Sequence, residues 1–472
     1  MTKRFLSLLA AFTLAVMIMA QPRAKYVFYF IGDGMGVNQV NGTTTYLAAL
    51  EGRIGVAPLT FTGFPVVGLG NTQSATNGVT DSAAAGTALA CGKKTKNGAL
   101  GVAANLSDSV FSIAVKAKEA GLAVGVSTSV AINHATPAAF YAHVPRRNQY
   151  HQIGKDLIKA GFDFYAGADF LKNTDQADLQ GSLDGQCEKA GYTLVRSYRE
   201  YQKQRRNAAK MLLLQGGKPS HGDASCLPYA IDRTKSDLTL QQITRAGISF
   251  LTQADKAGKG FFLMVEGGKI DYACHSNDAA TAFREVVDMD EAVRVAYEFY
   301  EQHPEETLIV ITADHETGGI VLGRGPYELH LDLLKYQKMS AESYSRHLKQ
   351  LFGKQAKVPA WEKVEADLKA NWGFWQEVKL TDQQTDRLKK AYEALASGHD
   401  QGTTNLYASL DGLADAARMT MAECALVGWQ SGGHSNGYVP VFAIGAGSEK
   451  FGGVMDNTLI PAKIAEAAGL DF

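Results

Sequence analysis

A run of small residues at positions 79–88 contains an acid, Asp81, followed directly by a hydroxyl, Ser82. Residues 83–91 predict a short helix that ends at Gly92, which places Ser82 at a helix N-terminus. Free backbone N–H groups and the positive end of the helix dipole favour an anion there, and alanine side chains leave room for a substrate. The simpler interpretation is that Asp81 or Ser82 only caps a buried helix. Ser82 becomes a nucleophile only if the rest of the chain supplies metal ions or a base.

Acidic residues and histidines follow the apolar segments that are expected to form strands. Because parallel strands place ligands at their carboxyl ends, these side chains are expected to converge from distant positions. Asp33, between glycines, could instead serve a turn, and Glu266 could be a solvated acid at a strand end. Asp314 and His315 follow a strand apolar enough to be buried, where charged groups are costly unless they are paired or bound to metal. The strands concerned are 25–31 before Asp33, 260–265 before Glu266 and 307–313 before Asp314.

Two further segments could contribute metal ligands. Asp271 and His275 are four residues apart, so they lie on one face if the segment is helical, which is a common way to hold zinc. A simple Asp–His hydrogen bond would show the same spacing. His434 lies in the glycine-rich segment 431–437 and is interpreted as either a surface residue or a ligand. Cys274 is left out of the ligand set because adjacent residues rarely both reach one ion.

Residues 133–147 follow another predicted strand and supply polar groups suited to phosphate. Thr136 contributes a hydroxyl, His134 an imidazole and Arg147 a guanidinium, the group best suited to bind two phosphate oxygens at once. His143 lies among apolar residues and is interpreted as structural.

The charge and the N-terminus of the chain limit its partners and its location. Among its 472 residues, 47 Lys plus Arg balance 48 Asp plus Glu, so no global charge favours nucleic acid or an anionic membrane. Lys3 and Arg4 before the apolar residues 5–20 predict a signal peptide that is cleaved after Ala20. We therefore expect an exported protein, periplasmic or secreted, with no stable membrane anchor.

The five cysteines do not form a disulfide scaffold in so long a chain. Cys187 and Cys226 lie in a polar, irregular region. They could pair after export or remain thiols.

Short apolar segments alternate with amphipathic ones along the chain. This alternation predicts an α/β fold, a three-layer sandwich with a central, mainly parallel sheet covered by helices on both faces. Residues 21–472 are expected to form a single domain. Two segments, at about 145–235 and 325–425, interrupt the pattern and are interpreted as insertions on the rim rather than parts of the sheet. Trp361, Trp372 and Trp375 of the second insertion are expected to pack a small core.

The motifs described above resemble those of the alkaline phosphatases, and the similarity extends over nearly the whole core. No single motif is decisive, but seven in the order of that family are hard to obtain by chance. They are GDGMG at 32–36, TDSAA at 80–84, ATPA at 135–138 with Arg147, VEG at 265–267, DYACH at 271–275, TADH at 312–315, and His434.

The resemblance implies two zinc ions and one magnesium ion per chain. Ser82, which would also contact the second zinc, would be the nucleophile that becomes phosphorylated. Arg147 would bind two phosphate oxygens, and Asp81 would orient Arg147. The implied ligand sets are Asp271, His275 and His434 for the first zinc, Asp33, Asp314 and His315 for the second, and Asp33, Thr136 and Glu266 for the magnesium.

Two positions vary between branches of the family that the chain resembles. His134 stands where some members have Asp, and Tyr272 stands where some have Lys or His. Both would lie near the third metal and the substrate phosphate. Because Tyr272 carries no positive charge, product phosphate is expected to inhibit less strongly than in relatives with Lys. The resemblance also implies that two chains could form a homodimer.

The predicted activity is hydrolysis of phosphate monoesters to an alcohol and phosphate. The nearest alternative is a phosphodiesterase or sulfatase of the same superfamily. Sulfatases need Pro and Arg close behind the nucleophile, whereas Ala and Gly follow Ser82, and Thr136 with Glu266 indicate a third metal site that diesterases need not have. A non-catalytic protein that binds phosphate or metal is a further alternative, which predicts a degraded ligand set.

Overall fold

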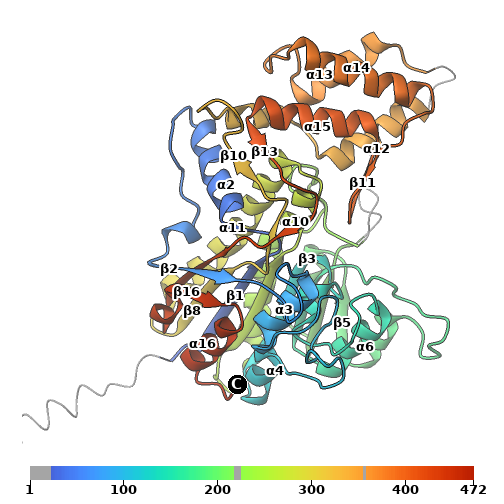
Figure 1. Cartoon of the computed structure of the whole chain (residues 1–472). Coiled ribbons are helices and arrows are strands. Elements are labelled where there is room, and N and C mark those ends of the chain that lie inside the picture. The colour runs from blue at the N-terminus through green and yellow to red at the C-terminus, as the bar shows by residue number, and fades with distance from the viewer. Residues whose placement is uncertain (1–22, 217–224, 354–357) are drawn as a thin grey trace, which may run out of the picture.

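The computed structural model describes residues 23–216, 225–353 and 358–472, so the predicted signal peptide, residues 1–20, lies outside the described part. Within these ranges, no helix is both long and apolar enough to span a membrane. Figure 1 shows a sheet flanked by helices, with a further group of helices projecting from one end.

A ten-stranded sheet forms the centre of the molecule. In spatial order, its strands are β16 (Gly453–Asp456), β2 (Val66–Asn71), β15 (Val439–Gly445), β8 (Thr307–Thr312), β1 (Tyr26–Gly32), β7 (Phe261–Gly267), β3 (Ala123–Ala131), β4 (Phe164–Ala168), β6 (Lys210–Leu214) and β5 (Tyr192–Val195). β15 runs antiparallel to β2 and β8, and the other neighbours run parallel. The prediction of a mainly parallel sheet is therefore confirmed.

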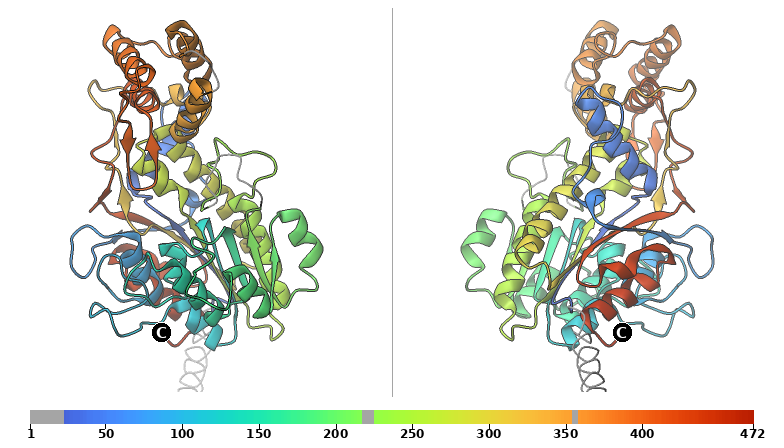
Figure 2. Two further views of the ribbon diagram at one scale, coloured as in Figure 1. Left: turned by 90° about the vertical axis from the view of Figure 1, so that its right-hand side faces the viewer. Right: turned by 90° about the vertical axis from the view of Figure 1, so that its left-hand side faces the viewer.

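Helices cover both faces of the sheet, and each face has its own hydrophobic core (Figure 2). On the first face lie α3 (Ser82–Cys91), α4 (Ile113–Glu119), α5 (Ala135–Ala138), α6 (Tyr150–Ala160), α7 (Leu183–Lys189) and α16 (Leu459–Ala468). On the second lie α2 (Val37–Leu50), α8 (Tyr198–Gln204), α9 (Leu240–Ala254), α10 (Lys269–His275) and α11 (Ala279–Gln302). Along β1, Tyr29 faces the first core and Phe30 the second, which is the alternation expected of a strand buried on both faces. The three-layer α/β fold is confirmed.

The interpretation of residues 145–235 as lying outside the sheet is wrong. They supply β4, β5 and β6, which form one edge of the main sheet. Each of these strands has only four or five residues and lies between polar and basic segments, so its apolar pattern is too short to stand out in the sequence. Cys187 belongs to the first core and Cys226 to the second, so the sheet separates them and no disulfide joins them.

Residues 325–425 form a helical group with a hydrophobic core of its own. It contains η2 (Leu331–Tyr336), α12 (Ala341–Gly353), α13 (Trp361–Trp372), α14 (Asp382–Ala396) and α15 (Gly412–Cys424). Trp372 is fully buried in this core, and Trp361 and Trp375 pack against it, which confirms the predicted packing role. A hairpin of β11 (Thr403–Thr404) and β12 (Ser409–Leu410) extends from the group back towards the sheet (Figure 1).

Short elements complete the end of the sheet where the loops gather. β9 (Glu316–Thr317) pairs with β14 (His434–Ser435), and β10 (Val321–Leu322) pairs with β13 (Val427–Gly428). The 3-10 turns η1 (Phe61–Gly63) and η3 (Ser448–Phe451) connect other elements. The pairing of β9 with β14 places His434 directly opposite Thr317.

Candidate active site

The predicted acids and histidines converge where β1, β7 and β8 end. Asp33 follows β1, Glu266 lies at the end of β7, and Asp314 with His315 follows β8. All four side chains are completely buried. Burying several carboxylates in one place costs free energy unless cations or donors compensate for it. The burial itself raises the pKa of Glu266 to about 8 and that of Asp314 to about 7.

Helix α3 presents Ser82 in its first turn. Asp81 caps the helix, because its side chain accepts a hydrogen bond from the backbone N–H of Ala84 at 3.1 Å, and Gly92 ends it with a φ of 63°. The Ser82 hydroxyl is not used as the cap. Its Oγ lies 3.3 Å from Nε2 of His315, among the buried acids.

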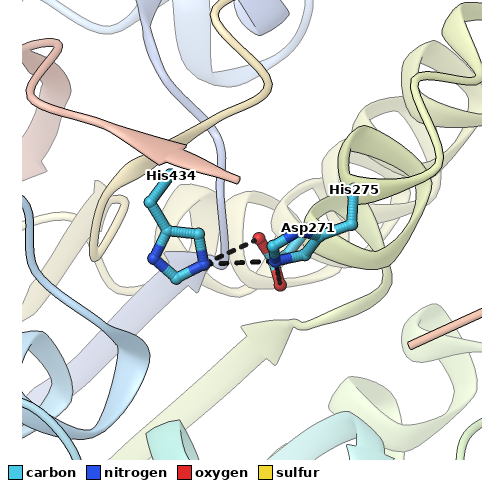
Figure 3. Close-up of side chains that lie close together, drawn as sticks. All are labelled: Asp271, His275 and His434. Carbon is cyan, nitrogen blue, oxygen red and sulfur yellow. Dashed lines mark hydrogen bonds and ion pairs between the residues drawn. The ribbon is translucent and has the colours of Figure 1, made fainter. Parts of the chain in front are cut away.

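Asp271, His275 and His434 form a compact group, to which α10 contributes the first two and β14 the third (Figure 3). Nε2 of His275 lies 3.3 Å from Asp271 Oδ2 and 3.2 Å from Nε2 of His434. Nε2 of His434 lies 3.8 Å from Asp271 Oδ1. Three ligand atoms from three side chains therefore surround one point.

In His275 and His434, the hydrogen bond at Nδ1 shows which ring nitrogen carries a proton. Nδ1 of His275 lies 2.6 Å from the carbonyl of Gly432, and Nδ1 of His434 lies 2.8 Å from the carbonyl of Thr80. Because a carbonyl only accepts, each Nδ1 carries a proton, and in the neutral form of each ring Nε2 presents a lone pair. Two lone pairs 3.2 Å apart beside a carboxylate repel one another, and a cation between them would remove the repulsion.

A second group surrounds Nε2 of His315. The Ser82 hydroxyl lies 3.3 Å from this nitrogen, and Asp33 Oδ1 and Asp314 Oδ2 each lie 3.4 Å from it. The His315 ring also stacks on that of His434, with centroids 3.6 Å apart. The two groups of potential ligands are therefore adjacent.

Thr317 connects the two groups and was missed by the sequence analysis. Its hydroxyl donates to Asp271 Oδ1 at 2.5 Å and lies 3.2 Å from Nδ1 of His315. Since its one proton goes to the carboxylate, the oxygen accepts from Nδ1 of His315, which again leaves Nε2 unprotonated. One feature of the sequence could have indicated this role. Thr317 comes two residues after His315, and residues two apart lie on the same side of an extended chain.

A third group consists of oxygen atoms. Thr136 Oγ1 lies 3.4 Å from Asp33 Oδ2, and the Thr128 hydroxyl donates to Glu266 Oε2. Among the described residues, the buried atoms Asp33 Oδ1 and Glu266 Oε1 have no hydrogen-bond partner. Buried acceptors of this kind fit a bound cation.

Arg147 is fixed by two of the predicted residues. Nη1 donates to Asp81 Oδ2 at 3.0 Å, and Nη2 lies 3.2 Å from Nε2 of His134. Because a guanidinium only donates, Nε2 of His134 accepts, and its proton is on Nδ1. Burial lowers the pKa of His134 to about 3, so the ring is neutral. His134 can thus orient Arg147, and in this state its Nδ1 carries a proton. Among the described residues this Nδ1 has no hydrogen-bond partner, and the ring lies with Asp33 and Glu266 in a group that could hold a metal ion if Nδ1 were unprotonated.

Tyr272 lies at the same side of the site and packs against Tyr407, a residue that no sequence motif marked as part of the site. The ring of Tyr407, from the hairpin of the insertion, stacks on it, and the hydroxyl of Tyr407 accepts a hydrogen bond from Arg147 Nη2 at 3.3 Å. Behind Tyr272, the Nζ of Lys269 lies 4.8 Å from the ring centroid. A positive charge therefore remains near this position, although Tyr272 itself has none.

Two residues are confirmed to lie outside these groups. His143 is structural, since its Nδ1 lies 2.7 Å from the carbonyl of Gly101 and its ring packs against Phe111. Cys274 points to the amide of Gln39, with Nε2 and Sγ 3.8 Å apart.

Comparisons with known proteins give one consistent result. A family model described as alkaline phosphatase matches residues 24–470. Alkaline phosphatase 3 of Bacillus subtilis is 32% identical over 455 residues, which are 95% of this chain and 89% of that protein. The crystal structure of a cold-active alkaline phosphatase from a psychrophilic Shewanella superposes with a TM-score of 0.77 at 29% identity, covering 94% of this chain and 99% of that one. The Thermus thermophilus alkaline phosphatase gives a TM-score of 0.76 at 28% identity, covering 95% and 92%.

Proposed function

Because the chain belongs to the alkaline phosphatase family and is a phosphomonoesterase, we propose that it acts with bound metal ions and through a phosphoserine at Ser82. The observation that carries this proposal is the surroundings of His315 Nε2, where the Ser82 hydroxyl and two buried carboxylates gather. A serine hydroxyl is a weak nucleophile unless a base or a metal activates it. His315 Nε2 lies beside the Ser82 hydroxyl, but the hydrogen-bond partner of His315 Nδ1 is the Thr317 hydroxyl rather than a carboxylate, so these residues do not form a Ser-His-Asp triad.

Three ligand sets fit three metal ions. Mixed imidazole and carboxylate ligands suit zinc, and oxygen ligands suit magnesium. When bound, these ions supply Lewis acidity, which lowers the pKa of a hydroxyl or water and neutralises developing negative charge. The proposed sets are Asp271, His275 and His434 for the first zinc, Asp33, Asp314, His315 and Ser82 for the second, and Asp33, Thr136 and Glu266 for the magnesium.

The protein groups position the phosphate for attack. Arg147, held by Asp81, binds two phosphate oxygens, and the free N–H groups at the start of α3 favour a third. Ser82 gives up its hydroxyl proton to water and its Oγ attacks phosphorus. The bond from phosphorus to the alcohol oxygen breaks, the alcohol oxygen takes up a proton from water, and the phosphoryl group stays on Ser82. Water attacks the phosphoserine from the side that the alcohol left, which releases phosphate and restores the hydroxyl.

Turnover of two model substrates tests this proposal. We expect nitrophenyl phosphate to be hydrolysed faster than bis-nitrophenyl phosphate, and Ser82→Ala to lower monoester turnover by at least about a thousandfold. Ser107→Ala, on an exposed loop, serves as the matched control and leaves turnover unchanged. Faster diester hydrolysis would favour the phosphodiesterase alternative, and unchanged turnover in Ser82→Ala would refute the assigned nucleophile.

We also propose that the protein is exported, to the periplasm or the medium, and that it acts on small phosphate monoesters. The basis for export is the sequence of residues 1–20. A mature protein that starts at Gln21, identified by N-terminal sequencing, is the expected result. The homodimer that the family resemblance implies is tested by sedimentation of the metal-loaded enzyme.

A further inference from the structure

Tyr407 is carried into the site by the hairpin of the helical insertion. Its ring lies 3.9 Å from that of Tyr272 at an interplanar angle of 12°, so the two rings are stacked. The same ring approaches His275 with centroids 5.1 Å apart and His134 with centroids 5.8 Å apart. Tyr407 therefore lies between the first metal group and the arginine that would hold the phosphate.

The loop that carries Tyr407 is fixed to the helix that carries Asp271 and His275. Asn405 Oδ1 accepts hydrogen bonds from the backbone N–H groups of Tyr407 at 3.0 Å and Ala408 at 2.7 Å. Asn405 Nδ2 donates to the hydroxyl of Ser276 at 3.1 Å, directly after the last residue of α10. The tip of the hairpin is thus positioned by α10 as well as by its own insertion.

The hydrogen bond between Arg147 and Tyr407 has a defined direction. Arg147 can only donate, so the oxygen of Tyr407 accepts and the hydroxyl proton of Tyr407 is left to donate elsewhere. Among the described residues, Arg147 is the hydrogen-bond partner of this hydroxyl. The side chain of Arg147 is 20% exposed and Tyr407 is partly exposed, so neither residue is sealed inside the core.

We propose that Tyr407 is a phosphate-binding residue of this site, whose hydroxyl donates a hydrogen bond to a phosphate oxygen held by Arg147. The proposal rests on the proposed function, in which Arg147 binds the phosphate. It gives the insertion a direct part in substrate binding. The stacked ring of Tyr272 holds the ring of Tyr407 so that its hydroxyl stays beside Arg147.

Binding of inorganic phosphate measures the hydrogen bond without turnover. In a Ser82→Ala background, calorimetric titration of the metal-loaded protein gives the Kd for phosphate. Adding Tyr407→Phe, which keeps the stacked ring and removes the hydroxyl, is expected to weaken phosphate binding by about tenfold, since hydrogen bonds to charged groups are among the stronger ones. A Kd within twofold of the Ser82→Ala value would overturn the proposal.

Leu406→Ala provides the matched control, because Leu406 is the exposed neighbour on the same hairpin. It is expected to leave the Kd unchanged. Metal content and melting temperature are measured for each variant. If Tyr407→Phe keeps both and still binds phosphate more weakly, the hydroxyl acts on the phosphate. If the weaker binding accompanies loss of metal, the role is structural and the proposal is wrong.

The same variants in the active background separate this proposal from the proposed function. Tyr407→Phe with Ser82 intact is expected to raise KM for nitrophenyl phosphate and to lower kcat much less. If the unaltered enzyme turns over monoesters through Ser82 and Tyr407→Phe matches it in KM, only the role of Tyr407 fails. If the unaltered enzyme itself does not hydrolyse monoesters, the proposed function fails.

Discussion

Hydrogen bonds from Nδ1 to two backbone carbonyls and to one threonine hydroxyl determine which ring nitrogen carries a proton in the three histidines near Ser82. In each case, Nδ1 is the donor and Nε2 is directed towards carboxylates. This is the tautomer that binds metal, and it is fixed by residues outside the ligand sets. These hydrogen bonds therefore hold the three histidines in the tautomer that can bind a cation.

Thr317→Val removes the hydroxyl that both orients Asp271 and fixes the tautomer of His315. Loss of such a supporting contact typically weakens metal affinity by about ten- to a hundredfold, and we expect a change in that range for zinc. Competition with a chelator measures it. Thr45→Val, on the outer side of α2, is the control and leaves zinc affinity unchanged. Equal zinc affinity in Thr317→Val would show that Thr317 has no part in the site.

The composition of the proposed third ligand set predicts which metal ion binds there. Since Arg147 requires His134 to accept at Nε2, the remaining ligands are oxygens, which favour magnesium over zinc. Protein saturated in a mixture of both metals is expected to contain two zinc ions and one magnesium ion by elemental analysis. Three zinc ions and no magnesium would mean that His134 turns its Nδ1 lone pair to the metal.

At the scale of the elements, the small residues of α3 allow two helices to meet. An added Cβ at Gly86 would lie 3.2 Å from Ala139 Cβ and 3.3 Å from Thr136 Cα, so a larger residue would push α3 away from α5. This contact holds Ser82, the proposed nucleophile, on one helix near the hydroxyl of Thr136 on the other.

Helix α11 carries a buried acid whose titration is expected to affect stability. Burial and the neighbouring Asp288 raise the pKa of Glu285 to about 7. The native protein therefore binds more protons than the unfolded chain between about pH 4.5 and pH 7, and the free energy of unfolding falls as the pH rises through this window. Glu285→Gln keeps an oxygen that accepts from the N–H of Ala230, and it removes the free-energy cost of ionising a buried carboxylate.

We expect the free energy of unfolding of Glu285→Gln to depend less on pH between about pH 4.5 and pH 7. At pH 8 the variant is expected to be more stable than the unaltered protein by about 1–3 kcal/mol. Chemical denaturation at matched metal saturation measures it. Glu298→Gln, on the exposed side of the same helix, is the control and should leave the pH dependence of the free energy of unfolding unchanged. An unchanged slope in Glu285→Gln would mean that Glu285 is ionised in the folded protein throughout.

The strands next to the site could be predicted because they are long, apolar and followed by acids. The predicted strands 25–31, 260–265 and 307–313 agree with β1, β7 and β8 to within two residues at each end. The edge strands β4, β5 and β6 were missed because a strand of four or five residues shows little pattern. Tyr407 could not be predicted, since its place depends on how a hairpin about 130 residues after α10 docks on that helix.

At the scale of the whole molecule, the stability of the sheet is expected to depend on the proposed metal sites at the ends of its strands. Buried carboxylates from three strands repel one another when no cation is present. Removing the metals with a chelator is therefore expected to abolish turnover and to lower the melting temperature. Chelator already saturated with zinc is the control and should do neither. An unchanged melting temperature and full activity after verified metal loss would contradict the proposed metal dependence.

Ser82 is proposed to carry the phosphoryl group during turnover. Rapid mixing of the metal-loaded enzyme with a phosphate monoester, followed by an acid quench and peptide mass spectrometry, detects that group directly. We expect a phosphate on Ser82 in the peptide that contains residues 79–88 and none on that peptide in Ser82→Ala. Turnover with no phosphoserine at any quench time, or with the phosphate on another residue, would contradict it.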